Sequence, residues 1–176
     1  EAALAKGLGQ AGVTSRSAGL LPTPGLAWLG REENAALGIM VSASHNPSHD
    51  NGIKLFGGNG GKLNDELQER IEDLLRQETA GEESSPANKL LIPEPGLENA
   101  YQQHLIHDLG AGLDLKHAKV VLDCANGAGS HVGPRVLSAV GATVIPIAHQ
   151  PDGQNINRRC GSTHPEALMK AVQAHG

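Results

Sequence analysis

Residues 42–54, with the sequence SASHNPSHDNGIK, bring a hydroxyl, an imidazole and an ammonium group together in one short polar segment. Ser44 is followed directly by His45, and Lys54 comes ten residues after the serine. A serine hydroxyl is a weak nucleophile, so it needs a base, a metal ion or a strongly polarised partner to react. A lysine can hold a phosphate group as a point charge or act as an acid or base. These residue types fit a site for phosphoryl chemistry.

Turn-forming residues determine how this segment is expected to fold. Residues 38–42 are mostly apolar and predict a buried strand that leads into the loop. The Asn-Pro pair at 46–47 favours a turn, because the residue before proline avoids the helical region. The Asn-Gly pair at 51–52 permits positive φ angles, which fold the loop back so that Lys54 can approach Ser44. We therefore expect a hydroxyl and a cation at the edge of a sheet.

Ser42 and Ser44 are alternatives for the reactive hydroxyl, since residues two apart on a strand point the same way. Ser44 lies nearer the turn, where the backbone can open toward a ligand. A serine at a strand end commonly hydrogen-bonds its own turn, and a single lysine is usually solvated. The residue pattern alone therefore leaves a purely structural role open for both Ser44 and Lys54.

The first half of the chain shows patterns of helices and short strands around this loop. A helix that starts near residue 64 has an apolar stripe at i, i+4, i+7 and i+8, which we expect to pack into the core. The expected elements are a helix over 1–11, a strand over 13–21, a helix capped by Thr23 with Pro24 in its first turn, a strand over 38–42, a hairpin turn over 57–61, and a helix capped by Asn64 with Leu67, Ile71, Leu74 and Leu75 on its apolar side.

The second half alternates between strand and helix patterns. Residues 77–95 are polar and contain three prolines, which indicates a linker or domain boundary. A strand, a turn, a helix and a strand at this spacing form a βαβ unit with parallel strands. The expected elements are a helix that carries Leu97, Tyr101 and Leu105, a strand over 119–124, a glycine-rich turn, a helix over 131–140, a strand over 142–147, and a helix with Pro165 in its first turn.

Composition excludes several classes of protein. The net charge is -5 without a basic block, which argues against nucleic acid as a partner. No stretch approaches the ~20 apolar residues that span a bilayer, so no membrane partner is expected. Cys124 and Cys160 are the two cysteines and have no CxxC spacing, which favours a reduced, cytoplasmic setting. With only three aromatic residues, the core must consist mainly of aliphatic side chains and alanine.

The quoted motifs resemble those of a known enzyme family. SASHNP at 42–47, followed by DNGIK at 50–54, resembles the phosphoserine loop of the α-D-phosphohexomutase superfamily. VVLDCANGAG at 120–129, PDGQNIN at 151–157 and CGSTHPEAL at 160–168 are similar to the bacterial phosphoglucosamine mutase branch. The resemblance extends over essentially the whole chain, in the order and spacing of the family.

The resemblance implies roles for three residues. Ser44 would carry the phosphoryl group, and an oxygen of its phosphate would be one ligand of Mg²⁺. Lys54 would be a candidate acid or base, and His45 would have a supporting role. The implied reaction interconverts glucosamine 6-phosphate and glucosamine 1-phosphate through a bisphosphorylated sugar. A phosphoglucomutase or phosphomannomutase of the same superfamily is the alternative that the resemblance leaves open.

The resemblance also implies an architecture. We expect an α/β fold of two similar domains, with mixed or parallel sheets flanked by helices and with both domains incomplete. Residues 1–92 would be the C-terminal part of domain I, and residues 93–176 the N-terminal part of domain II. The Asp-rich metal loop, the sugar-discriminating loop and the phosphate-binding domain of the family are not in this sequence. We therefore expect the chain by itself to be inactive, and the sequence assigns no oligomeric state.

Two other patterns suggest different functions. Gly127, Gly129 and Gly133 follow a strand and precede a helix, as in a nucleotide-binding turn, although the spacing is GxGxxxG. A tight turn that allows close packing is the favoured interpretation, and a non-catalytic nucleotide-binding α/β module is the alternative. His104 and His107 are three residues apart on an expected helix, but without a third ligand we interpret them as surface histidines.

Overall fold

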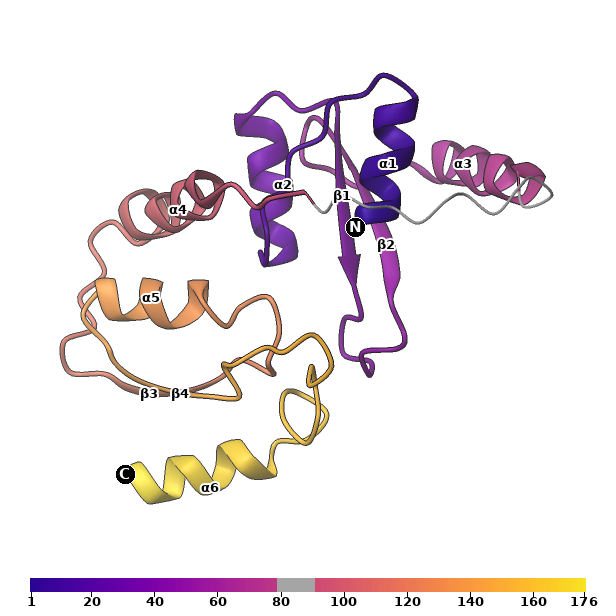
Figure 1. The fold of residues 1–176 in the computed structure, drawn as a ribbon. Coiled ribbons are helices and arrows are strands. Elements are labelled where there is room, and N and C mark those ends of the chain that lie inside the picture. The colour runs from indigo at the N-terminus through magenta and orange to yellow at the C-terminus, as the bar shows by residue number, and fades with distance from the viewer. Residues whose placement is uncertain (79–90) are drawn as a thin grey trace.

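A computed structural model describes residues 1–78 and 91–176 as an α/β chain with two small sheets, each packed against helices (Figure 1). Each of the two described sheets has two strands. This confirms the predicted α/β class. The elements are α1 (Ala2–Gln10), α2 (Thr23–Glu32), β1 (Leu37–Ser42), β2 (Gly52–Gly57), α3 (Asp65–Glu78), α4 (Pro95–Gln103), a π-helix η1 (His104–Leu109), β3 (Lys119–Asp123), α5 (Val132–Ala139), β4 (Thr143–Ile147) and α6 (Glu166–His175).

The first sheet pairs β1 with β2 in antiparallel orientation, with Ser42 opposite Gly52 and Met40 opposite Lys54. Residues 43–51 join the two strands as a loop at one end of this sheet. Because side chains alternate between the faces of a strand, the Met40, Ser42 and Lys54 positions share one face. The register therefore fixes where the loop begins and on which face Lys54 lies.

Helix α2 covers that same face of the sheet. A Cβ on Gly38 of β1 would lie 3.5 Å from Leu26 Cγ of α2, so the two elements are in contact. Phe56 of β2 is buried on this face. Gly30 lies inside α2, where a Cβ would be 3.9 Å from the Gly57 oxygen. The helix thus continues through Gly30, where a Cβ would make ordinary van der Waals contact with the sheet.

The hairpin turn predicted over residues 57–61 is confirmed. An antiparallel bridge between Phe56 and Lys62 closes the turn. Gly60 has a φ of 76°, and a Cβ there would lie 2.6 Å from the Ala27 backbone oxygen. The turn therefore packs tightly against α2.

The second sheet pairs β3 with β4 in parallel orientation, from Lys119 opposite Thr143 to Asp123 opposite Ile147. Helix α5 connects the strands and contacts β4, while α6 contacts β3. The βαβ unit and the parallel strands predicted for the second half are confirmed. Asp123 and Ile147 end their strands at the same edge, which places the loops that follow them side by side.

The buried core lies where α2, α4 and α5 meet, between the two sheets. Five buried side chains form it: Leu21, Leu29, Leu97, Tyr101 and Val132. Four of these are aliphatic, as the composition predicted. Because the first two come from the first half of the chain and the other three from the second, this core holds the two halves together.

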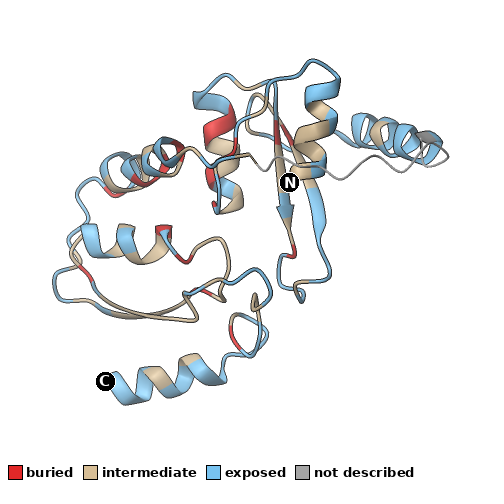
Figure 2. Cartoon of the chain, in the orientation of Figure 1, coloured by how far each residue is buried: buried red, intermediate tan, exposed pale blue. Residues whose placement is uncertain are grey.

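The predictions of a strand over residues 13–21 and of a buried apolar stripe on α3 were wrong. Residues 13–21 form no strand; within the described ranges they contribute one isolated parallel bridge, between Ser17 and Pro93. The apolar stripe of α3 does not pack into the core, because Leu67, Leu74 and Leu75 are 43–61% exposed. Figure 1 shows α3 standing away from the other elements, and Figure 2 shows it as largely exposed. An amphipathic pattern predicts a helix, but it does not determine whether another element packs against the apolar side of that helix.

Details at the helix and strand ends also differ from expectation. Pro22, rather than Thr23, occupies the N-cap of α2 and makes no side-chain capping bond. Asn64 does cap α3, since its Oδ1 accepts a hydrogen bond from the Leu67 N–H at 2.9 Å. β1 is only partly buried, with Val41 42% exposed. Of the linker predicted over 77–95, residues 79–90 lie outside the described residues.

Among the described residues, no helix is long and apolar enough to cross a membrane.

Candidate active site

Ser44 lies in the first turn of the loop between β1 and β2, and the residue is exposed. Its φ of 58° is in the left-handed region, which costs a residue other than glycine ~1–2 kcal/mol. The Ser44 N–H donates a hydrogen bond to Ser42 Oγ at 3.0 Å, and the Asn46 N–H donates to the Ala43 oxygen at 3.0 Å. The Ser44 hydroxyl has no hydrogen-bond partner among the described residues. The Ser42 hydroxyl thus accepts a hydrogen bond within the turn, and the choice of Ser44 as the reactive hydroxyl stays a prediction.

A residue from the second half of the chain holds the backbone of this turn. The Asn157 side-chain amide donates to the Ser44 oxygen at 3.0 Å and to the Asn46 oxygen at 2.8 Å. One Nδ2 group therefore uses both of its N–H bonds on the serine turn. The contact fixes the carbonyl on each side of His45 and so limits the conformations of the turn.

The loop that carries Asn157 is itself anchored to the end of β3. Asp123 Oδ1 accepts a hydrogen bond from the Ala125 N–H at 2.8 Å, and its Oδ2 accepts one from the Gly161 N–H at 2.7 Å. The Asn157 N–H donates to the Ala125 oxygen at 2.9 Å. A continuous set of hydrogen bonds thus runs from the second sheet to the turn of Ser44.

The structure relates His45 and Lys54 to Ser44 in different ways. His45 is exposed directly after Ser44, and its ring has no hydrogen-bond partner in residues 1–78 and 91–176. Lys54 is half-buried on β2, two residue pairs beyond the Ser42–Gly52 pair. At ~3.3 Å per strand residue, that is roughly 7 Å along the sheet from the level of Ser42. No hydrogen bond joins Lys54 to Ser44 in the described part of the chain, so its role stays a prediction.

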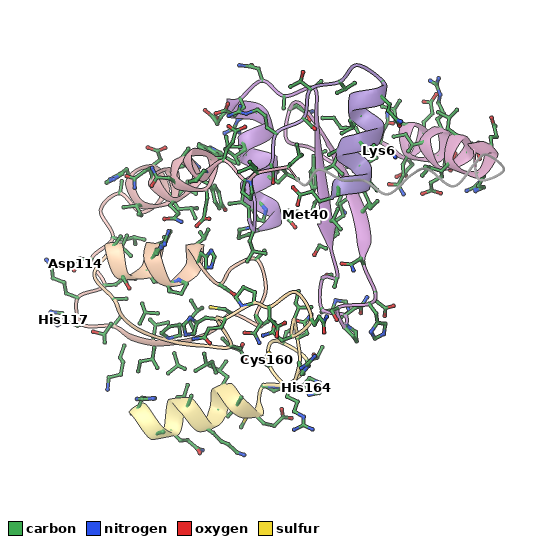
Figure 3. The ribbon with its side chains drawn as sticks, in the orientation of Figure 1. Lys6, Met40, Asp114, His117, Cys160 and His164 are labelled. Atoms are coloured by element: carbon green, nitrogen blue, oxygen red, sulfur yellow. The ribbon has the colours of Figure 1, made fainter. Side chains whose placement is uncertain are left out.

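Two cavities border the serine loop. The large cavity, of about 1000 Å³, lies between the halves; its lining includes Leu21, Met40, Ser42, Ala43, Asn126, His131, His149 and Asn155. The side chain of Met40 lies between β1 and α2 in Figure 3. The small cavity, of about 390 Å³, is lined by His45, Pro47, Ser48, His49, Gln154, Ile156, Asn157, Arg158, Arg159, Thr163 and His164. The loop therefore separates two spaces, each with walls from both halves.

The glycine-rich turn after β3 pairs two of its backbone N–H groups internally. The Gly127 N–H donates to the Cys124 oxygen at 2.8 Å, and the Ser130 N–H donates to the Gly127 oxygen at 3.1 Å. A Cβ on Gly133 would lie 3.0 Å from Leu122 Cδ2, so the helix packs closely on the strand. Because two amides of the turn are paired within it and Gly133 lies against the strand, the geometry favours the packing role over a nucleotide site.

His104 is not the surface histidine that the sequence predicted. Its ring stacks on Trp28 with centroids 4.6 Å apart, and its Nδ1 lies 2.7 Å from Asp108 Oδ2. Its side chain is only 18% exposed. The carboxylate partner was missed because it lies four residues ahead, on the π-helix that continues α4. His107 is exposed and hydrogen-bonds Gln103, as expected for a surface residue.

A metal site does not arise from these residues alone. Among the described residues, no group of three His, Cys, Asp or Glu side chains is placed to hold a metal ion. The aspartates at 114, 123 and 152 instead accept backbone N–H groups. The donor set of this chain therefore fits a full metal site only if other ligands complete it.

The two cysteines are buried and free. Burial, with a smaller contribution from the Asp123 carboxylate, raises the pKa of both the Cys124 and Cys160 thiols. The thiols therefore stay protonated at neutral pH and are poor nucleophiles. Cys124 packs as the small apolar residue that the sequence predicted, and Cys160, whose role the sequence left open, is also buried.

Sequence reasoning missed Asn157 and Asp123. Both residues were visible within motifs, Asp123 at the end of a strand and Asn157 in a polar loop, but their partners are 38 and 113 residues away. The signal that could have drawn attention to them is chemical. An Asp that follows a buried strand and an Asn in a loop without other capping duties commonly bind backbone groups.

The sequence of the chain is similar to the sequences of known proteins. Residues 1–82 match the family model described as phosphoglucomutase/phosphomannomutase, alpha/beta/alpha domain I. The chain is 49% identical over 177 residues to a phosphoglucosamine mutase of Desulforamulus reducens, covering all of this chain and 40% of that protein. It is 48% identical over 174 residues to a phosphoglucosamine mutase of Alcanivorax borkumensis, covering 98% of this chain and 38% of that protein.

A solved structure has a similar fold. A phosphoglucomutase/phosphomannomutase family protein from Burkholderia thailandensis superposes with a TM-score of 0.68 and 24% identity, over 98% of this chain and 37% of that one. At this identity the likeness concerns the fold alone. The chain spans about two fifths of the length of the curated relatives that it matches.

Proposed function

Because this chain belongs to the phosphohexomutase superfamily, we propose that the whole protein interconverts glucosamine 6-phosphate and glucosamine 1-phosphate with Ser44 as the phosphoryl carrier. The observation that carries the proposal is the turn of Ser44. Ser44 is held in a left-handed backbone conformation by contacts from both halves of the chain, and its exposed hydroxyl has no hydrogen-bond partner among the described residues. The near-50% identity to phosphoglucosamine mutases supports the choice of an amino-sugar phosphate as substrate.

The reaction consists of two phosphoryl transfers. In the first, the bond between Ser44 Oγ and phosphorus breaks and a sugar hydroxyl oxygen bonds to phosphorus, which gives a bisphosphorylated sugar. The hydroxyl loses its proton to a base, for which Lys54 is the candidate, and Ser44 regains a proton. In the second, Ser44 Oγ loses its proton and bonds to the phosphorus of the sugar's other phosphate, while the bond from that phosphorus to the sugar oxygen breaks and the sugar oxygen takes up a proton. His45 supports the transfer from its position beside the serine.

Positioning and electrostatics carry most of the rate in such transfers. The Asn157 contact holds the Ser44 backbone before substrate arrives, so little reorganisation of the turn is required. In the whole protein, an oxygen of phosphorylated Ser44 would be one ligand of Mg²⁺, and other ligands would come from outside this chain. When bound, Mg²⁺ neutralises negative charge on the transferring group.

The domain organisation follows from the same proposal. We assign residues 1–92 to domain I and residues 93–176 to the beginning of domain II. The match of the family model to residues 1–82 supports the first assignment, and the separate sheet of β3 and β4 supports the second. With two fifths of the family length and no complete metal site among the described residues, the chain alone is expected to give no turnover with Mg²⁺ and glucose 1,6-bisphosphate.

A second candidate is a mutase for glucose or mannose phosphates. The description of the matching family model, phosphoglucomutase/phosphomannomutase, favours keeping it. Assays of the whole protein with glucosamine, glucose and mannose 6-phosphates separate the candidates. The proposal predicts the highest kcat/KM for the amino sugar, and a higher value for either other sugar contradicts it.

Intact-mass analysis of the whole protein tests Ser44 directly. The native protein should carry a phosphoryl adduct of ~80 Da, and Ser44→Ala should remove both the adduct and mutase activity. Ser48→Ala is the matched control, because Ser48 lies in the same loop and its hydroxyl has no hydrogen-bond partner in the described ranges. An adduct that persists in Ser44→Ala, or disappears in Ser48→Ala, excludes Ser44 as the acceptor.

A further inference from the structure

The small cavity lies between two loops from different halves of the chain. The serine loop contributes His45 and His49, and the loop before α6 contributes Arg158, Arg159 and His164. Figure 3 shows His164 on this second loop, near Cys160. These five side chains carry or can acquire positive charge. The cavity thus gathers cationic groups that are far apart in the sequence.

No acidic side chain balances them within the cavity. Neither Asp nor Glu is among its lining residues, all of which lie in the described part of the chain. Basic side chains that share a concave surface without counter-charge repel one another and create a positive potential there. An anion in the cavity relieves that repulsion.

The donors in the cavity are largely unused. The Arg159 guanidinium has no hydrogen bond or ion pair within the described ranges, and neither do the rings of His49 and His164. Arg158 donates one N–H to the Gln154 oxygen at 3.1 Å, which leaves its other N–H groups available. Two guanidinium groups offer paired donors whose geometry matches the oxygens of a phosphate.

The walls of the cavity are tied to each other. Asn157 lines the cavity and also donates to the Ser44 and Asn46 oxygens of the opposite loop. Its backbone N–H is bound to Ala125. The two loops therefore keep their spacing without a ligand, which lowers the entropic cost of binding one.

We propose that the small cavity is a binding site for a phosphate dianion, held by Arg158 and Arg159 with support from His164. Ser44 is not among the lining residues, so this site does not require Ser44 to carry a phosphoryl group. The phosphate can be free orthophosphate or the phosphate of a sugar phosphate. Because His45, Pro47 and Ser48 line the cavity, it would be a second anion site next to the acceptor loop.

Calorimetric titration of the 176-residue chain with sodium phosphate tests the site, with sodium chloride adjusted to keep the ionic strength constant. The native chain should bind one phosphate. Arg159→Gln should weaken binding about tenfold or more, because a charge-assisted hydrogen-bond donor is lost. If circular dichroism shows that Arg159→Gln does not fold, His164→Gln replaces it and should weaken binding in the same direction.

The control separates a specific site from net charge. Arg135→Gln removes the same charge from the exposed surface of α5, outside the cavity, and should change the affinity less than about twofold. Absence of saturable phosphate binding, or equal weakening by Arg135→Gln and Arg159→Gln, would overturn the proposal. Ser44→Ala should bind phosphate like the native chain, so failure of the proposed reaction and failure of this site are distinguishable.

A second titration identifies the source of the phosphate. Glucosamine 6-phosphate that binds more tightly than orthophosphate, and loses that affinity in Arg159→Gln, supports a sugar phosphate as the ligand. Equal affinities that are both lost in Arg159→Gln support free orthophosphate. Binding of glucosamine 6-phosphate that Arg159→Gln leaves unchanged contradicts the site for either ligand.

Discussion

Asn157 and Ser44 are 113 residues apart in the chain, and the Asn157 amide donates a 3.0 Å hydrogen bond to the Ser44 backbone oxygen. The same amide reaches the Asn46 oxygen at 2.8 Å. Asn157 has a φ of 58°, so two residues in left-handed conformations meet at this contact. The turn that presents Ser44 is therefore built jointly by its own sequence and by a loop of the second half.

Asn157→Ala should loosen the serine turn without unfolding the chain. Two hydrogen bonds to backbone oxygens are lost, each with a net contribution of about 0.5–1.5 kcal/mol. Amide hydrogen exchange in residues 44–46 should become faster, and in the whole protein kcat should fall about 10-fold while KM changes little. A residue that positions the serine turn without binding substrate should lower kcat and leave KM nearly unchanged.

Asn155→Ala provides the comparison for Asn157→Ala. Asn155 also donates from its side chain to a backbone oxygen, that of Gln150, but within its own loop. We expect a similar loss of stability and unchanged exchange in residues 44–46. Faster exchange there in Asn155→Ala, or unchanged exchange in Asn157→Ala, would contradict a specific link between Asn157 and the turn.

Asp123→Asn should destabilise the loop that carries Asn157. The Asp123 carboxylate accepts N–H groups from Ala125 and Gly161, and hydrogen bonds to charged groups are worth about 1.5–3 kcal/mol. An amide keeps one acceptor oxygen and turns the other into a donor, which faces an N–H. Chemical denaturation should show a loss of about 2 kcal/mol, whereas Asp114→Asn, at an exposed site with short-range partners, should lose less than half of that.

Elements with local signals were predictable from the sequence, and their partners were not. The hairpin over 57–61 and the cap at Asn64 depend on neighbouring residues, and both appear as predicted. The exposure of α3 depends on what surrounds the helix, which periodicity does not encode. The prediction of a strand over 13–21 was wrong for a related reason, since a strand forms only where another strand provides hydrogen-bond partners along its length.

The candidate site also has features that the local sequence predicts and features that depend on distant residues. Ser44, His45 and Lys54 lie within eleven residues, and the turn residues of that segment predicted a hydroxyl and a cation at the edge of a sheet. The register of β1 and β2, which leaves Lys54 opposite Met40, is a property of the strand pair. The Asn157 contact joins the two halves and is invisible to any local pattern.

Gly60→Ala should be more destabilising than Gly12→Ala, although both glycines have nearly the same φ, 76° and 73°. Either alanine meets the left-handed conformation, at about 1–2 kcal/mol. At Gly60 the new Cβ would also lie 2.6 Å from the Ala27 oxygen, while at Gly12 it meets no atom within 4 Å. The clash adds about 1–3 kcal/mol. Equal losses for the two variants in denaturant unfolding would show that α2 moves away from the turn at no cost.

Arg16 contacts two glutamates, and its contact with Glu94 makes the stability of the fold depend on pH. Its guanidinium binds Glu94 through Nε at 3.0 Å and Nη2 at 2.7 Å, and Glu33 through Nη1 at 2.6 Å. The hydrogen bonds from Arg16 lower the pKa of the Glu94 carboxyl below its ordinary value. The carboxylate form therefore stabilises the folded chain above the unfolded pKa of about 4.3, and this stability is lost as the pH falls through the folded pKa.

Glu94→Gln should make the melting temperature depend less on pH below about pH 5. Melting temperatures of the native chain should fall more steeply below about pH 5 than those of Glu94→Gln, and the difference should shrink in 1 M sodium chloride because the pair is exposed. Glu69→Gln, at an exposed site on α3 without an ion pair among the described residues, should keep the native pH profile. A native and a Glu94→Gln profile that run parallel through pH 3–6 would show that the contact joining residue 16 to residue 94 adds nothing to folding.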